Sequence, residues 1–416
     1  MSKTKGRLTL PSQANFLKET KELIDRWGAD AIRDSDGTKL DEATKQLDAK
    51  IYTTYFVARN HNEFAEKHME ECQQIYVMSK FHLATSNELE IPFMDGYFTD
   101  QVQPDYVHDE KLYWEVIDRT TGKVVSVENW VLDKERNIVT VHETEAFHEY
   151  TVSFLVYAIW DPTQMYNHIT NNWGNVPHDI PFDVRQPASN EYMQTYLKNW
   201  LKENPDTDVV RFTTFFYHFT LIFNQLGKEK FVDWFGSSIS VAALEAFAKE
   251  KGYRLRAEDI VDEGYYNSTF RTPSKAYLDY IDFIQKFVAT EAKKLVDLAH
   301  DAGKEAMMFL GDNWIGTEPY GKYFKEIGLD AVVGSVGGGA TLRMISDIPH
   351  VKYTEGRFLP YFFPDVFREG NDPTIEANKN WLSARRAIMR NPVDRIGYGG
   401  YLSLAYQFPK FVDYIE

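Results

Sequence analysis

The chain has 416 residues, of which 43% are hydrophobic and 26% charged, too apolar for intrinsic disorder and long enough for a large barrel or two ordinary domains. The formal net charge of −16 argues against nucleic acid and anionic membranes as partners, because both reward clustered Lys and Arg. Cys72 is the single cysteine, which excludes an internal disulfide and a cysteine-based metal site. The polar start MSKTKGRLTL and the lack of a long apolar run predict a soluble cytoplasmic protein.

Helix and strand patterns alternate in the first part of the chain. FLKETKELIDRW predicts a helix at 16–27, and ADAIRDSDGT predicts a strand at 29–38 that ends in polar residues. A second strand is expected at Lys50–Ala58 and a further helix in NEFAEKHMEECQQIYVMS, at 62–79. From about 88 to 157, short β-type runs separated by turns predict an antiparallel β-rich insert.

Helical and strand-like segments resume after Asn190, with a helix expected at 191–204, strand-like residues at 208–223 and a long helix at about 274–303. Four strand-then-loop segments follow: EAMMFLGDNW, LDAVVGSVGGG, VKYTEGRFLPYFF and VDRIGYGGYLS. Short apolar strands that alternate with helices are typical of a parallel α/β fold, and we expect a (β/α)8 TIM-type barrel over 1–416 that carries the β-rich insert. The final QFPKFVDYIE reads as the first turns of a helix, which suggests a truncated chain.

Reactive residues of such barrels follow the C-terminal ends of the strands. Asp312 comes after the apolar EAMMFLG and before Trp314, and a partly desolvated position beside an aromatic ring raises a carboxyl pKa and favours a general acid. Asp312 could instead cap the following turn. Glu318 is the rival carboxylate.

Groups that could hold an anion occur at or near other strand-like segments. Arg33, Arg211 and Arg357 could clamp phosphate or sugar hydroxyls in a bidentate manner, although such residues are more often structural ion-pair partners. Gly337 and Gly338, in GSVGGGAT, could offer backbone N–H groups, but this spacing is neither a P-loop nor a dinucleotide fingerprint. His218 is most simply a core or cleft histidine.

The sequence contains neither an HExxH motif nor a G-x-S-x-G elbow, so zinc-dependent hydrolysis and serine-based acyl transfer are disfavoured. Carboxylate chemistry on a polar, neutral substrate remains, and glycosyl transfer fits it. The 15% aromatic content suits a sugar-binding cleft but also an ordinary large core.

Four long motifs carry a family resemblance: GRLTLPS, WGADAIRDSDGT at Trp27–Thr38, GDNWIGTEPYG at Gly311–Gly321 and TEGRFLPYFFPD at Thr354–Asp365. The chain closely resembles the 1,3-β-galactosyl-N-acetylhexosamine phosphorylases, also called lacto-N-biose or galacto-N-biose phosphorylases, and their galactosyl-rhamnose phosphorylase relatives. Members of that family are longer, so the resemblance implies the N-terminal catalytic barrel region without the C-terminal family domains.

The resemblance implies a hexosyltransferase of the phosphorylase type, which converts galactosyl-β-1,3-N-acetylhexosamine and phosphate to α-galactose 1-phosphate and free N-acetylhexosamine with inversion. It places the general acid at Asp312, cleft residues at Arg33, Arg211 and Arg357, and an acceptor-side residue at Asn167. An inverting hydrolase needs two carboxylates, whereas a phosphorylase needs one, because phosphate arrives as an anionic nucleophile.

No metal or organic cofactor is therefore expected, and inorganic phosphate is the expected co-substrate. A homodimer is one assembly to test. Three alternatives stay open at this point: a galactosyl-β-1,4-rhamnose phosphorylase, a β-galactosidase-like hydrolase, and an inactive sugar-binding fragment.

Overall fold

The computed structural model describes residues 6–35, 38–57, 60–160, 178–213, 215–216, 220–223, 229–232, 239–267, 271–310, 321–358 and 366–416. Its contacts divide the chain into two compact units. The barrel unit comprises Met1–Val57, Met193–Phe216 and Val288–Glu416, and the second unit comprises Ala58–Tyr192 and Tyr217–Phe287. Two excursions of the chain, one after the third barrel strand and one after the fourth, thus supply the second unit.

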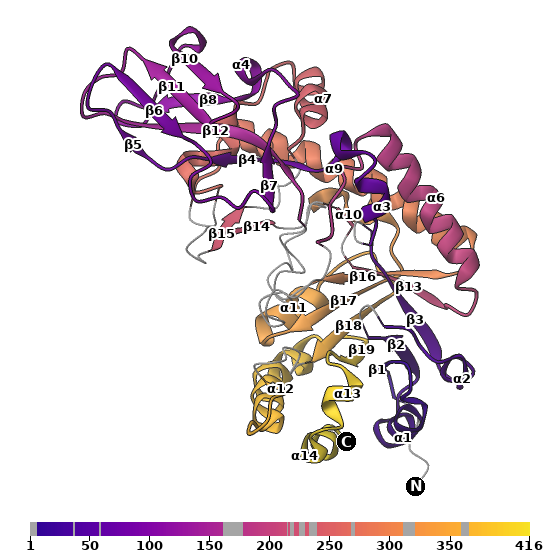
Figure 1. Cartoon of the computed structure of the whole chain (residues 1–416). Helices are drawn as coiled ribbons and strands as arrows, with labels where there is room; N and C mark the ends of the chain where they lie inside the picture. Colours follow the sequence, from indigo (N-terminus) through magenta and orange to yellow (C-terminus); the bar gives the residue numbers. More distant parts are fainter. Residues whose placement is uncertain are drawn as a thin grey trace. The chain divides into compact units, whose positions relative to one another are not determined.

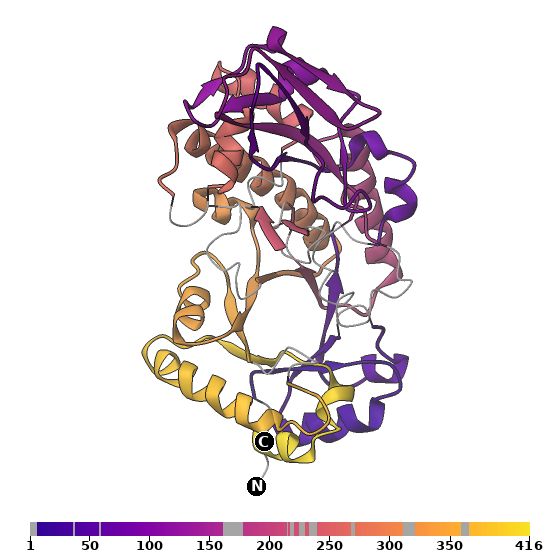
Figure 2. The same cartoon turned by 60° about the vertical axis from the view of Figure 1, so that its left-hand side comes forward.

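Eight parallel strands close the barrel, and each strand pairs with the strands before and after it in the ring (Figures 1 and 2). The closed ring confirms the expected TIM-type barrel. In ring order the strands are β1 Leu8–Ser12, β2 Ala31–Asp34, β3 Lys50–Tyr55, β13 Val209–Thr213, β16 Glu305–Leu310, β17 Ala331–Val336, β18 Tyr353–Phe358 and β19 Arg395–Tyr398.

Helices connect these strands, and the helices expected at 16–27, 191–204 and 274–303 are present with small shifts at their ends. The sequence patterns missed β1, a short strand that contains a proline. The helices are α1 Leu17–Trp27, α2 Glu42–Lys45, α6 Pro187–Glu203, α9 Lys275–Asp301, α10 Phe324–Ile327, α11 Gly339–Ser346, α12 Pro373–Arg390, α13 Leu402–Ala405 and α14 Pro409–Ile415.

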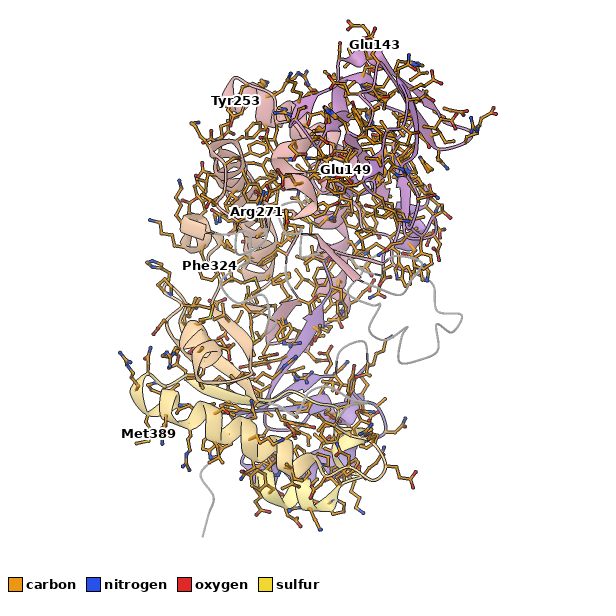
Figure 3. All side chains as sticks on the ribbon, turned by 90° about the vertical axis from the view of Figure 1, so that its left-hand side faces the viewer. Glu143, Glu149, Tyr253, Arg271, Phe324 and Met389 are labelled. Carbon is orange, nitrogen blue, oxygen red and sulfur yellow. The ribbon has the colours of Figure 1, made fainter. Side chains whose placement is uncertain are left out.

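Helix α12 shows how the outer layer covers the barrel. Asp372 caps its first turn by accepting from the Thr374 amide, and Pro373 occupies the first helical position, where a missing N–H costs nothing. Its buried residues recur every three or four positions, as one helix face requires: Pro373, Ala377, Asn380, Ala384 and Ala387. The opposite face is open, and Met389 on it is 88% exposed (Figure 3).

The middle of the barrel is filled by inward-facing side chains from alternate positions of the strands. Six buried residues form one cluster there, with Phe309 and Tyr353 packed against it: Ala31, Tyr52, Val209, Met307, Ala331 and Val333. Because successive side chains on a strand point to opposite faces, residues two positions later on these strands also point into the barrel, nearer its C-terminal rim.

A buried ion-pair network fills part of the opposite end of the barrel. Arg395 donates two hydrogen bonds to Asp30, at 2.6 and 3.0 Å, and one at 3.4 Å to Glu355. The Thr9 hydroxyl donates to Glu355 at 2.6 Å. A side chain at position 397 would come within 2.6 Å of the Glu355 carboxylate, so Gly397 leaves the space that this carboxylate occupies. The network compensates the cost of burying charged groups inside the barrel.

Asp330 lies just before β17 and joins three segments. Its carboxylate accepts from the Ala306 amide at 2.8 Å, lies 2.7 Å from His300 Nε2, and pairs with Lys352 at 2.7 Å. Burial by itself would raise the pKa of Asp330, but these partners together lower it below its ordinary value.

The second unit contains antiparallel sheets. One has β12 at its centre, paired with β4, β5, β7 and β8, and β9 extends it beyond β8. Its strands are β4 Gln74–Met78, β5 His82–Leu83, β7 Val102–Pro104, β8 Glu115–Asp118, β9 Lys123–Val124 and β12 Glu149–Ala158. The others are β6 Glu88–Pro92, β10 Trp130–Asp133 and β11 Ile138–His142 in one sheet, and β14 Thr220–Phe223 with β15 Glu229–Val232 in another.

Short helices accompany these sheets: α3 Asn62–Ala65, α4 Glu110–Tyr113, α7 Val241–Lys251 and α8 Ala257–Val261, with 3-10 turns at Met69–Glu71, Val127–Asn129 and Asp262–Gly264 in this unit and Gly321–Tyr323 in the barrel unit.

The prediction of a single helix at 62–79 is wrong, since 74–78 forms strand β4. All five residues of β4 are buried and pair with β12, so sheet pairing overrides the helical pattern there. The description of 88–157 as an insert within one catalytic domain stays a prediction.

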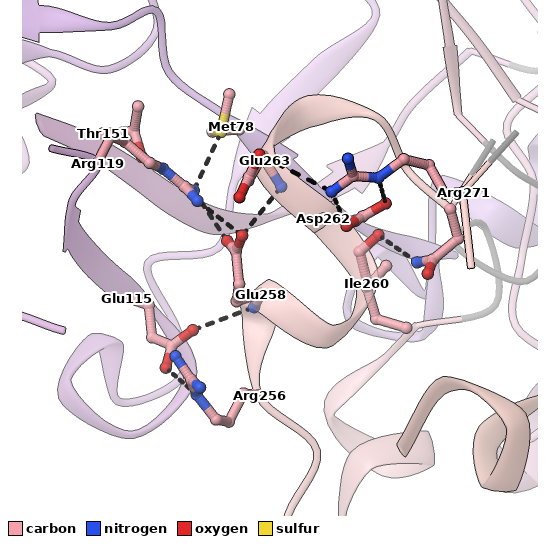
Figure 4. A network of polar contacts seen from close by, with 11 residues as sticks. Met78, Glu115, Arg119, Thr151, Arg256, Glu258, Ile260, Asp262, Glu263 and Arg271 are labelled. Carbon is pink, nitrogen blue, oxygen red and sulfur yellow. Dashed lines mark hydrogen bonds and ion pairs between the residues drawn. The ribbon is translucent and has the colours of Figure 1, made fainter. Parts of the chain in front are cut away.

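Ion pairs tie the two segments of the second unit together (Figure 4). Arg119, just after β8, donates to both oxygens of Glu258 on α8, at 2.6 and 2.8 Å. Arg256 donates to Glu115 at 2.7 Å, and the Glu258 amide donates to the same carboxylate at 3.0 Å. The Arg119 side chain is almost fully covered. Salt screens a covered ion pair much less than an exposed one, which favours a structural role for the pair with Glu258.

Cys72 is buried in the second unit, and burial raises the pKa of its thiol to about 12. Within the described ranges, no helix is both long enough and apolar enough to cross a membrane.

Candidate functional site

Three arginines predicted from the sequence meet at the C-terminal rim of the barrel. Arg33 follows the inward-facing Ala31 on β2 by two positions, and Arg211 follows the inward-facing Val209 on β13 in the same way. Arg357 lies on β18, two residues after Glu355, whose carboxylate bonds Thr9 inside the barrel. The strand period of two therefore directs all three side chains inward. Each is at most 3% exposed.

Arg33 is held by backbone carbonyls. Its Nη1 donates to the carbonyl oxygen of Asp34 at 2.8 Å, and its Nη2 donates to those of Gly399 and Gly400 at 3.1 and 3.2 Å. The two glycines follow β19, which is separated from β2 by β1 in the ring. Carbonyl acceptors fix the planar guanidinium without neutralising its charge.

Asp34 and Thr54 connect β2 to Arg211. Both oxygens of Asp34 accept from the Thr54 amide at 3.0 Å, and one of them accepts from the Thr54 hydroxyl at 2.5 Å. The same hydroxyl oxygen accepts from Arg211 Nη1 at 3.2 Å. Since a hydroxyl has one proton to donate, its bond to Asp34 leaves its lone pairs directed toward the guanidinium.

Phe309 on β16 connects Arg211 to Arg357. The guanidinium carbons of Arg211 and Arg357 lie over its ring, 4.6 and 4.1 Å from the ring centroid. Both distances are within cation–π range. A side chain at position 399 would come within 3.0 Å of Arg357 Cγ, so Gly399 provides the space through which Arg357 passes.

These contacts run along the barrel mouth from Gly399 to Arg357, and we call the residues involved the arginine girdle. Its members are Arg33, Asp34, Thr54, Arg211, Phe309, Arg357 and Gly399. The girdle brings three permanently charged groups into one buried layer. Guanidinium groups present N–H donors in a planar fork that matches phosphate or carboxylate oxygens, so the layer is suited to bind a small anion with several oxygens.

The predicted glycine-loop residues lie after β17. Gly337 is exposed, and the amide of Gly338 donates to the Thr341 hydroxyl at 3.1 Å. An anion at this amide would share it with Thr341. Their anion-binding role stays a prediction.

Two predicted site residues, Asp312 and Asn167, lie outside the described residues, as do Glu318 and His218. Asp34 belongs to the polar end of the strand predicted at 29–38, but the sequence patterns did not indicate Thr54, Phe309 or Gly399. The available signal was position within the strand: on β3 and β16, Thr54 and Phe309 follow inward-facing core residues by two positions, as Arg33 and Arg211 do on their strands.

One pocket of about 500 Å³ lies elsewhere in the barrel unit, lined by residues of α1, β1, β18, β19, α12 and α14, among them Trp27, Trp381 and Tyr398. It contains none of the predicted site residues. No group of three or more His, Cys, Asp or Glu side chains suited to a metal ion occurs among the residues with assigned positions.

Comparison with known proteins gives one matching family model, described as the lacto-N-biose phosphorylase N-terminal TIM barrel domain, over residues 6–416. A 1,3-β-galactosyl-N-acetylhexosamine phosphorylase of Lachnoclostridium phytofermentans is 58% identical over 417 residues, which cover 100% of this chain and 58% of that protein. A protein of the same name from Bifidobacterium longum subsp. longum is 58% identical over 410 residues, with 98% of this chain and 55% of that protein covered.

A more distant relative is the D-galactosyl-β-1→4-L-rhamnose phosphorylase of L. phytofermentans. It is 40% identical over 423 residues, which cover 99% of this chain and 58% of that protein. The chain thus spans somewhat more than half the length of these curated relatives.

Proposed function

We propose that this chain, which belongs to the family of lacto-N-biose phosphorylase N-terminal TIM barrel domains, acts in the phosphorolysis of galactosyl-β-1,3-N-acetylhexosamine. The reaction transfers galactose from the disaccharide to inorganic phosphate and yields α-galactose 1-phosphate and the free N-acetylhexosamine. The proposed acceptor sugar follows the relatives of 58% identity, since the relative named for rhamnose is 40% identical.

The arginine girdle is the observation that carries the proposal. A phosphorolytic site must hold inorganic phosphate, and Arg33, Arg211 and Arg357 supply the charge and the N–H donors for it at the rim where TIM barrels place their chemistry. A hydrolase would instead need a base to activate water. In the proposed reaction a phosphate oxygen attacks C1 of galactose from the face opposite the leaving oxygen.

The leaving oxygen needs a proton as the C1–O bond breaks, and we assign this proton to Asp312. Asp312 follows the last residue of β16, Leu310, by two positions. In this scheme Asp312 gives its proton to the hexosamine oxygen and recovers one from solvent after the products leave. Asn167 is the proposed acceptor-side residue. The bond from phosphate forms on the opposite face from the broken bond, so the product is the α-anomer.

The test incubates the purified protein with galacto-N-biose, with and without phosphate, and follows galactose 1-phosphate and its anomeric form. The proposal requires phosphate-dependent α-galactose 1-phosphate, and Asp312→Asn should abolish it without altering the melting temperature. Galactose released without phosphate would identify a hydrolase. A much higher rate with galactosyl-β-1,4-rhamnose would change the acceptor, and calorimetric sugar binding without turnover would identify a binding fragment.

A further inference from the structure

Phe309 contacts two of the girdle arginines. The guanidinium carbons of Arg211 and Arg357 lie 4.6 and 4.1 Å from its ring centroid. The two carbons are therefore separated by no more than the sum of these distances. One phosphate can bridge such a separation, because each guanidinium nitrogen bonds an oxygen at roughly 2.7–2.9 Å.

The strand order explains why an aromatic ring is needed to join them. Arg211 lies on β13, next to β16, but Arg357 lies on β18, with β17 between its strand and that of Phe309. On β17 the residue in register with Arg357 is Ser335, which is buried and small. Arg357 thus passes the short side chain of Ser335 to reach the ring of Phe309. The same ring is contacted by Arg211 from the other side of β16, on β13.

The chemistry of the contact sets its effect on a bound anion. A guanidinium that lies over an aromatic face keeps its N–H groups in its own plane, where they can still donate to oxygens. The negative face of the ring also offsets part of the repulsion between two cations held close together. A ring in this position therefore fixes the directions of two forks without using their donors.

We propose that Phe309 is a positioning residue that holds Arg211 and Arg357 in place for one phosphate, a role that rests on the proposed function. Phe309 itself donates nothing to the anion. Its contribution is preorganisation, which lowers the cost of ordering two long side chains when phosphate binds.

The experiment compares three variants of the purified protein. Phe309→Leu removes the aromatic face and keeps an apolar side chain, and Phe309→Tyr keeps the face. Phe212→Leu is the matched control: Phe212 lies on β13, is fully buried, and packs against Tyr55 and Phe215 at ring separations of 5.7 and 5.0 Å. Binding of inorganic phosphate is measured by calorimetry, and KM is measured separately for phosphate and for disaccharide.

We expect Phe309→Leu to weaken phosphate binding and to raise the phosphate KM by roughly tenfold, the scale of two weakened cation–π contacts. The disaccharide KM should stay within about twofold. Phe309→Tyr should restore phosphate binding, and Phe212→Leu should lower the melting temperature without the selective effect on phosphate.

Failure of this inference is distinct from failure of the proposed function. If turnover depends on phosphate but Phe309→Leu leaves the phosphate Kd unchanged, or changes both KM values equally, the positioning role is wrong. If wild-type protein binds phosphate in a Phe309-dependent way but never uses it in turnover, the positioning role holds and the proposed reaction is wrong. Absence of phosphate binding to the wild-type protein overturns the inference.

Discussion

The hydroxyl of Thr54 offers the most direct test of the arginine girdle. It donates to Asp34 at 2.5 Å and accepts from Arg211 at 3.2 Å, so Thr54→Val removes two hydrogen bonds to ionised groups while the side chain keeps almost the same volume. Asp34 keeps its bonds from the Thr54 amide. We expect the free energy of unfolding to fall by about 1.5–3 kcal/mol, the usual contribution of a hydrogen bond to a charged group.

The kinetic effect of Thr54→Val follows from the loosened Arg211. If about 1.4 kcal/mol of phosphate binding depends on this orientation, the KM for phosphate rises about tenfold, whereas the KM for disaccharide changes little. Phosphorolysis rates at varied phosphate, together with urea unfolding, measure both quantities. Thr54→Ser restores the hydroxyl and should recover most of the loss.

Thr53→Val is the matched control for this test. Thr53 is the adjacent residue of β3, points to the other face of the strand, and its hydroxyl bonds that of Thr207 at 2.7 Å. Its loss should cost about 0.5–1.5 kcal/mol of stability, as a neutral hydrogen bond does, and leave the phosphate KM unchanged. Equal phosphate KM values for the two valine variants would refute the role given to Thr54.

Three further outcomes follow from the described contacts. Gly399→Ala places a methyl group 3.0 Å from Arg357 Cγ and should raise the phosphate KM several-fold in steady-state assays, because Arg357 must shift. Asp330→Asn should lower the free energy of unfolding at neutral pH by about 1.5–3 kcal/mol. Because the folded-state pKa of Asp330 is depressed, the stability that this carboxylate contributes is present above its unfolded pKa and is lost as pH falls through the folded pKa. The unfolding free energies of wild type and Asp330→Asn should therefore converge in acid. Glu258→Gln should lower the melting temperature by weakening the covered pair with Arg119, with both KM values unchanged.

Gly338→Ala tests the predicted glycine-loop role separately. A Cβ at 338 meets nothing within 4 Å, and its φ of −174° is extended backbone open to any residue. Alanine there should fold normally. A normal melting temperature with a raised phosphate KM would support close approach of phosphate to this amide.

The roles of Asp330 and Glu258 can each be contradicted. A stability difference between wild type and Asp330→Asn that persists at low pH would contradict the first, and a change in the phosphate KM alone in Glu258→Gln would contradict the second.

Much of the barrel could be predicted because its strands are short apolar runs that end in polar residues. Arg33 and Arg357 lie near such ends and Arg211 lies in the middle of β13. Period-two geometry places them on inward faces once the inward-facing core residues are known. Strand β1 was missed because a short strand with a proline carries little pattern of its own and is defined by its pairing with β2 and β19.

The site residues that the sequence did not reveal act through neighbours distant in the chain. Thr54 contacts Arg211, and the carbonyl of Gly399 accepts from Arg33, 366 residues away. A threonine, a phenylalanine or a glycine in a strand has many ordinary roles. Which arginine each of these residues contacts becomes visible only when the eight strands are closed into the barrel. Residue type could suggest the charges of the girdle but not the neutral side chains that connect them.

The ring order has a consequence for how the polypeptide folds as it is synthesised. Ile51 on β3 donates to Asp208, 157 residues later, and Leu8 on β1 pairs with Ile396 on β19. The first three strands can pair with one another early, but the outer edges of β1 and β3 stay unpaired until β19 and β13 have been synthesised. The central sheet of the second unit, by contrast, is complete once β12 has emerged. Until β19 appears, the barrel is an open parallel sheet with two unpaired edges, the state in which aggregation competes with folding. A chaperone that shields such edges should raise the yield of folded protein.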